Sequence, residues 1–434
     1  MPSNTVGIWV LAGSFVILLL LRFPVALVLA ISAMATLFYL QMPIVVVAQQ
    51  ILQGTNSFSL LAIPFFIMTG QLLGAGGLAN RIVDFANLFF GRLPGGLSIV
   101  NSIACMLFGN LSGSAVADTS AIGSAMIPIM KKKGYPAEYA VGLTISSAIQ
   151  GVVVPPSHNL VLYSIVAAGV VGGISIPKLF AAGIVPGFLL LITLCTVGII
   201  ISVKNKYPKG DPVERKKIPS IVLHGFLSLT PAVIILGSII GGIATATEAG
   251  ALAVVYSFLL GTLVYREIKP KHLWPVLVRT FRTVLMVFFL IGASTAFGYA
   301  MTILRLPDLI TQGFLAVSSN PIIILLLINV LLLILGGPMD MAPMIVILTP
   351  ILLPVCMKLG MDPIQFGLVL IFNAGMGLLT PPVGTVLFVG CAIGKVSVKA
   401  GTKAMLPFFY AMLVVLMLIT YVPAFTMWLP QFVR

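Results

Sequence analysis

The chain has 434 residues, of which 59% are hydrophobic and 8% are charged, and its formal net charge is +14. So much apolar surface excludes an ordinary soluble protein, and the long unbroken apolar runs exclude a membrane β-barrel, so we predict an all-α polytopic membrane protein. The positive charge is explained by cationic cytoplasmic loops, and we expect no nucleic-acid partner because no soluble domain is left to carry such a site.

Eight apolar runs are each near the length of a helix that crosses the lipid bilayer. A helix of about 17 residues still crosses the hydrocarbon core, so the two shortest runs are counted as spans. The runs are residues 5–21, 24–40, 57–75, 179–201, 222–243, 248–264, 283–303 and 404–427.

Two longer apolar regions, 138–171 and 363–392, are interrupted by the tandem prolines Pro155-Pro156 and Pro381-Pro382. Proline lacks the amide donor of a helix and clashes with the preceding turn. We therefore predict a broken helix in each region, which lipid tolerates where the freed backbone lines protein or water.

Two other apolar regions, 97–130 and 321–357, carry polar and glycine-rich residues at their centres. The central sequences are G-N-L-S-G-S-A-V-A-D (109–118) and G-G-P-M-D (336–340). Such interruptions are unfavourable in one continuous span. We predict that each region is a re-entrant hairpin with its tip at membrane depth.

The distribution of Lys and Arg predicts the orientation. If Arg81, Arg92 and the lysines at 131–133 are cytoplasmic, the first hairpin enters the membrane from that side, and most cationic residues fall inside. The cationic residues left outside are Lys178, Arg305, Lys358 and Arg434. This orientation places both termini on the periplasmic side of a bacterial inner membrane.

Counting the elements reveals an internal repeat. Residues 1–203 read as three spans, a hairpin, a broken helix and a final span, and residues 220–434 repeat the series after a cytoplasmic connector at 204–219. Each half crosses five times, an odd number, so the second half lies upside down relative to the first. Inverted repeats with broken helices are typical of secondary transporters. A chance likeness between two hydrophobic halves is the alternative.

The hairpin tips and helix breaks are the candidate ion sites. Freed carbonyls and hydroxyls can coordinate Na⁺, and half-helix N-termini can face an anion. Small residues that let helices pack closely are the alternative reading. The candidates are Ser112, Ser114 and the carbonyls of 151–156 in the first half, and Gly336, Gly337, Gly377, Thr380 and Val383 in the second.

Two intramembrane aspartates lie near the predicted tips. Asp118 and Asp340 each precede a proline, Pro128 or Pro350, by ten residues, so the sequence places them at equivalent positions. Intramembrane carboxylates are expensive and usually functional. They are candidates for binding a cation or substrate, and equally for capping the second arm of each hairpin.

His158 and Asn159 follow the first proline pair directly and are further candidates for binding substrate. They can donate hydrogen bonds to a carboxylate or hydroxyl, or only satisfy backbone where the helix restarts. Glu248 is expected to be a helix N-terminal residue at the outer interface, with a functional role as the alternative. No embedded Arg or Lys is available to clamp a carboxylate, so half-helix dipoles, bound Na⁺ and polar side chains must hold an anion.

Motifs for catalysis are missing from the sequence. We find no GxxxxGK[ST], HExxH or GxSxG pattern, and the four cysteines form no CxxC pair. We therefore expect no enzyme and no cofactor.

At its motifs the chain resembles the large membrane subunit of tripartite ATP-independent periplasmic (TRAP) transporters, of the DctM/SiaM type, over essentially its whole length. The motifs are F-S-L-L-A-I-P-F-F (58–66), L-S-G-S-A-V-A-D (111–118), V-P-P-S (154–157), S-I-P-K-L-F-A-A-G-I-V-P-G (175–187), T-E-A-G-A (247–251) and L-L-T-P-P-V-G (378–384).

The resemblance implies a sodium-coupled elevator that imports small organic anions such as sugar acids or C4-dicarboxylates. It implies two partners, a small four-helix membrane subunit and a periplasmic substrate-binding protein. One implied sodium site consists of Ser112, Ser114, Gly151, Val154 and Pro156. The other consists of Gly336, Gly377, Thr380 and Val383, where Val383 replaces the Met of some relatives. His158-Asn159 replaces more apolar residues of sialic-acid-type members, which favours a polyhydroxylated sugar acid.

Two alternatives to this function stay open. One is a free-standing sodium/carboxylate symporter that needs no binding protein. The other is a non-transporting scaffold of an envelope complex, in which Ser112 and Thr380 would be replaceable without consequence.

Overall fold

The computed structural model describes residues 3–210, 213–381 and 383–433, and within these ranges the regular structure is helical, with no β-strand. The helices of the first half are α1 (Asn4–Leu20), α2 (Val25–Tyr39), α3 (Val45–Thr55), α4 (Ala62–Ala75), α5 (Leu78–Phe90), α6 (Gly96–Ser112), α7 (Ala115–Lys132), α8 (Ala137–Ala148), α9 (Gln150–Val153), α10 (His158–Val171) and α11 (Ile176–Lys204).

The second half continues the series after residues 205–217. Its helices are α12 (Ile218–Ile240), α13 (Ala246–Leu259), α14 (Pro270–Ile303), α15 (Leu306–Val317), α16 (Pro321–Gly336), α17 (Met341–Lys358), α18 (Pro363–Gly377), α19 (Thr385–Gly394), α20 (Val398–Tyr421) and α21 (Ala424–Met427). Short 3₁₀ or π segments lie at Phe58–Leu61, Arg215–Lys217, Leu260–Val264 and Leu429–Phe432.

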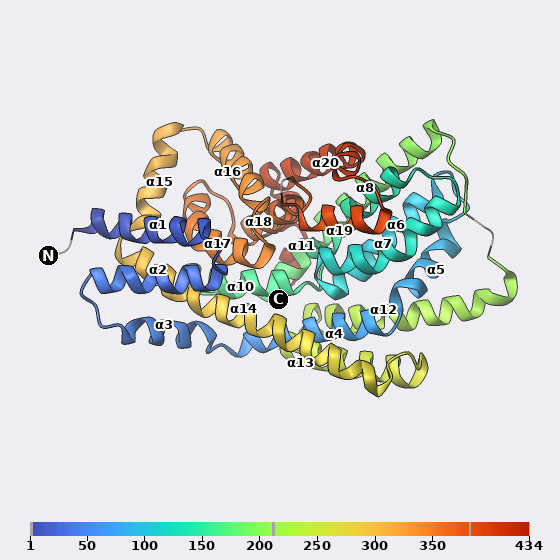
Figure 1. Ribbon diagram of the computed structural model, residues 1–434, viewed down its shortest axis with the longest axis horizontal. Helices are drawn as coiled ribbons and strands as arrows, with labels where there is room; N and C mark the ends of the chain where they lie inside the picture. The colour runs from blue at the N-terminus through green and yellow to red at the C-terminus, as the bar shows by residue number, and fades with distance from the viewer. Residues whose placement is uncertain (1–2, 211–212, 382, 434) are drawn as a thin grey trace.

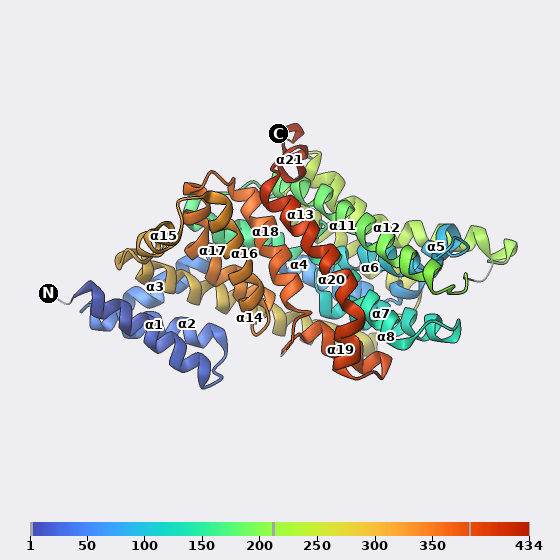
Figure 2. The same ribbon diagram turned by 90° about the horizontal axis from the view of Figure 1, so that it is seen from above.

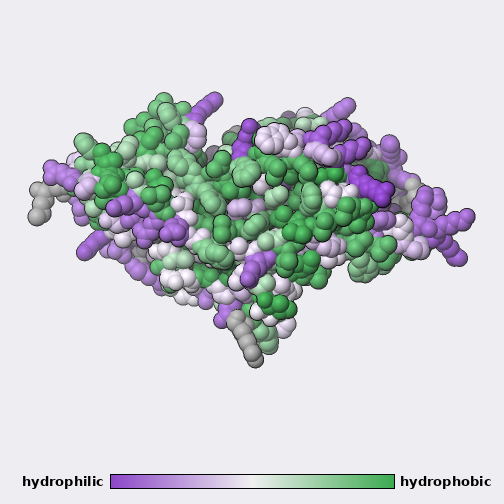
Figure 3. All heavy atoms as spheres, turned by 90° about the horizontal axis from the view of Figure 1, so that it is seen from below, coloured by the Kyte–Doolittle hydropathy of each residue, from purple (hydrophilic) through white to green (hydrophobic). Residues whose placement is uncertain are grey.

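Several helices are long and apolar enough to cross a membrane. Among the described residues there are seven such helices, or nine when two bent helix pairs are each counted as one span. Figure 3 shows hydrophobic residues over the middle of one face and hydrophilic residues gathered toward the ends of the long axis. The prediction of an all-α polytopic membrane protein is confirmed.

The helices form two packed groups. In the first, α14 packs against α2, α3 and α4, and α13 packs against α4 and α12. Figure 1 shows α3, α4, α13 and α14 along one long side of the molecule, with α16 and α20 on the other. The α1–α2 pair lies at one end of the long axis, and α5 with α12 lies toward the other (Figure 2).

The second group interlocks the two halves of the chain. Helix α10 of the first half packs against α17 of the second, and α19 of the second half packs against α7 and α8 of the first. Helix α20 packs against both α8 and α11. Residues 97–130 and 321–357, where the sequence predicts hairpins, each form two helices that contact one another, α6–α7 and α16–α17.

Three helices were not predicted, namely α3, α5 and α15, and α14 begins at Pro270, well before the predicted span 283–303. The apolar residues of α5 lie on one face, where Leu78, Ile82 and Ala86 are buried, while polar residues occupy the other face. A search for continuous apolar runs misses such amphipathic helices, because their mean hydropathy is low.

The first proline pair breaks a helix as predicted. The peptide bond between Pro155 and Pro156 is cis, and the axis of α10 is bent by 47° from the helical segment Ala137–Val153. Ser157 caps the restarted helix, because its hydroxyl accepts a hydrogen bond from the amide of Asn159. In the second half α18 ends at Gly377 and α19 begins at Thr385, and Pro382 lies outside the described residues.

Candidate ion and substrate sites

The turn between α6 and α7 gathers oxygen atoms at the tip of the first hairpin. Gly113 has a left-handed backbone with φ of 62°, which reverses the chain there. The Ser112 hydroxyl lies 3.3 Å from the carbonyl oxygen of Gly109 and 3.5 Å from that of Ser114. Ser114 caps α7, its hydroxyl accepting a hydrogen bond from the Ala117 amide at 3.3 Å. One hydroxyl and two carbonyls thus converge, which is the donor type that Na⁺ prefers.

This tip is fastened to the start of α10. The side-chain amide of Asn159 donates a 2.8 Å hydrogen bond to the carbonyl of Gly113. The His158 ring lies directly against Gly113, where a side chain on that residue would overlap it. The structure therefore brings His158 and Asn159, two of the predicted substrate-binding residues, to the first tip, where the side-chain amide of Asn159 already donates a hydrogen bond within the protein.

Below the tip, α6 crosses the first arm of the broken helix at a pair of glycines. A methyl group on Gly109 would lie 2.6 Å from the Cα of Gly151, so the two backbones touch. Seven to eight residues earlier, Asn101 donates a 2.7 Å hydrogen bond to the Thr144 hydroxyl. The hydrogen bond between Asn101 and Thr144 and the close contact between the two glycines together hold the first arm of the hairpin against the broken helix.

The second half has a similar pair of contacts, in which the hydrogen bond is donated by the broken helix to the hairpin arm. A methyl group on Gly336 would lie 3.0 Å from the Cα of Gly377, and Asn373 donates a 2.8 Å hydrogen bond to Asn329. Beside this crossing, the Thr380 hydroxyl donates to the carbonyl of Gly377 at 2.7 Å. A methyl group on Gly337 would lie 3.3 Å from that hydroxyl, so the second tip and the second break also meet.

The remaining predicted ion ligands lie at the breaks. Val154 is extended, with ψ of 126°, and is buried together with Pro156 immediately after α9. A side chain on Gly187 of α11 would overlap Val154, so α11 packs closely against this break. Val383 is 41% exposed, after α18 has ended.

The two aspartates are placed differently, so the prediction of equivalent positions is wrong. Asp118 lies in the first turn of α7 and is fully buried, and a methyl group on Gly109 would lie 3.0 Å from its carboxyl oxygen. Asp340 is exposed and caps α17, its carboxylate accepting a 2.8 Å hydrogen bond from the Met341 amide. Helix α7 begins three residues before Asp118, whereas α17 begins one residue after Asp340, so equal spacing to a downstream proline does not give equal positions in the helix.

The carboxyl of Asp118 faces few hydrogen-bond donors. Apart from the neighbouring Cys105 thiol, no donor in the described part of the chain hydrogen-bonds to either oxygen. Ser114, and not Asp118, supplies the side-chain cap of α7.

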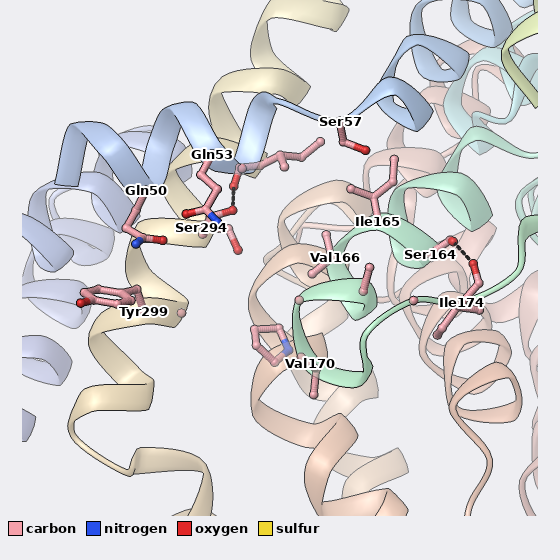
Figure 4. Close-up of a pocket in the computed structure, with 18 of the residues that line it drawn as sticks. Gln50, Gln53, Ser57, Ser164, Ile165, Val166, Val170, Ile174, Ser294 and Tyr299 are labelled. Atoms are coloured by element: carbon pink, nitrogen blue, oxygen red, sulfur yellow. Dashed lines mark hydrogen bonds between the residues drawn. The ribbon is translucent and has the colours of Figure 1, made fainter. Parts of the chain in front are cut away.

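A cavity of about 770 Å³ lies between α3 and α14 on one side and α10 and α17 on the other. Figure 4 shows Gln50, Gln53 and Tyr299 on the first wall, with Val166 and Val170 of α10 across from them. None of the predicted site residues lines it. The sequence signal that was missed is the Gln-rich face of α3, since residues 45–55 were not predicted as a helix.

A second, smaller cavity of about 490 Å³ adjoins the first. Ser59, Ile174 and Ile176 line both cavities. Glu248 lines the second cavity and closes a capping box at the start of α13, where its carboxylate accepts from the Thr245 amide at 2.8 Å. The predicted helix N-terminal role of Glu248 agrees with this geometry.

Comparison with known proteins identifies relatives along nearly the whole chain. Residues 12–425 match the family described as tripartite ATP-independent periplasmic transporter, DctM component. The 2,3-diketo-L-gulonate TRAP transporter large permease protein YiaN of Escherichia coli is 36% identical over 92% of this chain and 93% of its own length. The sialic acid TRAP transporter large permease protein SiaM of Vibrio cholerae is 38% identical over 88% of this chain and 89% of its own.

A solved structure shares the fold. The YdaH transporter of Alcanivorax borkumensis superposes with a TM-score of 0.63 over 88% of each chain, at 14% sequence identity. At that identity the likeness concerns the fold alone.

Proposed function

Because this chain belongs to the DctM family of TRAP transporter components, we propose that it is the large permease of a sodium-coupled importer of small organic acids that works by an elevator mechanism. The family is a transporter component and not an enzyme, and it works with a small membrane subunit and a substrate-binding protein. The resemblance read from the sequence motifs is thereby confirmed.

The observation that carries the proposal is the pair of matching helix crossings. In each half, an asparagine-mediated bond and a glycine crossing join the first arm of a hairpin to the first arm of a broken helix. Such a recurrence is what two inverted repeats of five spans would produce, the first within 1–203 and the second within 220–434. It makes close helix packing alone, or a chance likeness of two hydrophobic halves, a poorer account.

At each crossing we assign a sodium site. The first consists of Ser112, Ser114, Gly151, Val154 and Pro156, where a hydroxyl and carbonyl oxygens converge at the tip. The second consists of Gly336, Gly377, Thr380 and Val383, where the Thr380 hydroxyl lies on the Gly377 carbonyl. Broken helices favour such sites because their freed carbonyls replace the hydration shell of the ion.

The two helix groups give the elevator its parts. The interlocked group with both hairpins is the moving body, and the group around α14 is the fixed body braced by a small four-helix subunit. In a bacterial inner membrane, the loops at 172–175 and 304–305 and both termini would then face the periplasm. The binding protein would deliver substrate on that side. The large cavity lies between the two groups, where substrate must pass.

The substrate is an organic acid, by analogy with relatives named for 2,3-diketo-L-gulonate and sialic acid. Both named compounds are hydroxylated acids. In this proposal the half-buried His158 at the first tip would donate a hydrogen bond to the carboxylate, and Asp340 at the second tip is exposed. Asn159 would position the first tip and would not contact substrate, because its side chain is hydrogen-bonded to Gly113. Asp118 would also act as a positioning residue, because it is buried.

The proposal is tested by uptake into proteoliposomes that hold the chain and its small subunit. Radiolabelled sugar acids and dicarboxylates are supplied with an inward Na⁺ gradient, with or without the cognate binding protein. We expect uptake that requires both Na⁺ and the binding protein. Uptake with Na⁺ alone would establish a free-standing symporter, and proton-driven uptake that ignores Na⁺ would overturn both ion sites.

A further inference from the structure

The large cavity carries no charge on its lining. Its polar side chains are neutral amides and hydroxyls, and the rest of the lining is apolar or glycine. We propose that this cavity binds the uncharged, hydroxyl-bearing part of the transported acid, with Gln50 and Gln53 as the hydrogen-bonding residues. The inference rests on the proposed function and names the class of substrate, a polyhydroxylated monocarboxylate.

The packing of α3 against α14 positions the two glutamines. Gln50, Gln53 and Gly54 recur three and four residues apart, so they share one face of the helix. A side chain on Gly54 would overlap Thr295 of α14, so the two helices touch there. This close approach fixes the glutamines along one edge of the cavity.

Most other polar groups of the lining are already used within the protein. The hydroxyls of Ser164, Ser294 and Thr302 donate to backbone carbonyls at 2.7, 3.0 and 2.8 Å. The side-chain amides of Gln50 and Gln53 make no hydrogen bond with the described residues. Each amide offers two donors and one acceptor oxygen, which matches the mixed donor and acceptor character of a sugar hydroxyl.

The opposite wall is apolar. Ile165, Val166 and Val170 of α10 face the cavity, with Pro350 and Pro354 of α17. Such a wall can pack against the C–H groups of a sugar chain. Its apolar side chains offer a second carboxylate neither an opposite charge nor a hydrogen bond in place of the water that it loses. A buried charge without a partner is far costlier than a hydroxyl that is hydrogen-bonded, so the cavity discriminates against dicarboxylates.

The volume fits this class of ligand. A cavity of about 770 Å³ lies within the roughly 300–1,000 Å³ range of small-molecule sites, so an acid of six to nine carbons has room to enter. A lipid tail is the competing occupant, and it would leave both glutamine amides without partners in an apolar environment.

The inference is tested first by thiol protection, which does not depend on transport. Gln53→Cys in the full chain with its small subunit, reconstituted in vesicles, is labelled by a membrane-impermeant maleimide. Gluconate at millimolar concentration should slow labelling severalfold, and succinate at the same concentration should not. Gln49→Cys, on an exposed part of α3 outside the lining, is the control and should be unaffected.

Three labelling results would overturn the inference. These are equal slowing by gluconate and succinate, no slowing by either acid, and labelling that proceeds in detergent but is blocked in lipid vesicles whichever acid is present. The last result would identify a lipid as the occupant.

Uptake separates this inference from the proposed function. The double variant Gln50→Leu/Gln53→Leu should raise the KM for a hydroxylated acid about tenfold, since each lost neutral hydrogen bond weakens binding roughly threefold or more. The sodium concentration for half-maximal uptake should not change, and Gln49→Leu should behave as wild type. If wild-type uptake is sodium-driven and the double variant matches it, this inference alone fails. If wild type takes up no organic acid with sodium, both fail.

Discussion

The glycine crossings should be intolerant of a single methyl group. Gly151→Ala and Gly377→Ala each add a Cβ where the opposite glycine backbone leaves no room. In the reverse direction, a Cβ on Gly109 would lie 2.6 Å from the Cα of Gly151, and a Cβ on Gly336 would lie 3.0 Å from the Cα of Gly377. Nonbonded carbons prefer about 3.5–4.0 Å, so the hairpin arm and the broken helix must separate by roughly 1 Å.

The cost follows from packing. Overpacking a close contact costs about 1–3 kcal/mol, and these contacts fall in the upper part of that range, at about 2–3 kcal/mol, because the clashing atoms are backbone and cannot rotate away. Alanine regains about 1 kcal/mol of helix propensity, so roughly 1–2 kcal/mol remains. If this strain falls on the ion sites, the sodium concentration for half-maximal uptake should rise about 5- to 30-fold. Gly237→Ala is the matched control, since a Cβ there meets nothing within 4 Å, and it should leave sodium dependence unchanged.

The assay is sodium-dependent uptake in proteoliposomes, with the thermal midpoint of each purified variant measured in parallel. The midpoint shows whether a variant is folded, so a loss of uptake is not mistaken for a loss of sodium affinity. Gly151→Ala and Gly377→Ala variants with unchanged sodium dependence would refute the placement of the ion sites at the crossings.

Substitutions at three further positions test other parts of the structure. Thr380→Ala should weaken sodium activation about tenfold, because it removes a hydroxyl that lies 2.7 Å from the Gly377 carbonyl, whereas Thr380→Ser should stay near wild type in the same uptake assay. Asp118→Asn should retain most uptake and Asp118→Lys should abolish folding, as followed by size-exclusion chromatography, because the buried site has no partner for a charge. Arg81→Lys should lower the thermal midpoint by a few degrees, because lysine cannot keep the 2.6 Å bond to Glu267 together with both backbone bonds and the stacking on Tyr265.

The elements that carry strong local signals were predictable. Proline pairs and glycine-rich interruptions dictate backbone breaks whatever surrounds them, so the break at Pro155-Pro156 and the turn at Gly113 stand where the sequence places them. The apolar spans follow from composition, because lipid allows few alternatives to helix.

What depends on packing was not predictable. Helix α3 is short and mixed in character, and its role in lining the cavity appears only when Gly54 meets α14. The different settings of Asp118 and Asp340 depend on where each hairpin turn ends, which equal spacing to a downstream proline does not reveal. The glycine crossings likewise join residues about 40 positions apart, and no local pattern pairs them.

Binding of radioactive sodium to the purified chain with its small subunit, without substrate, tests the two ion sites most directly. We expect saturable binding that Thr380→Ala reduces and that Ser112→Ala together with Thr380→Ala abolishes, in variants with unchanged thermal midpoints. Saturable binding that the double variant leaves intact would contradict the assignment of sodium to the two hairpin tips.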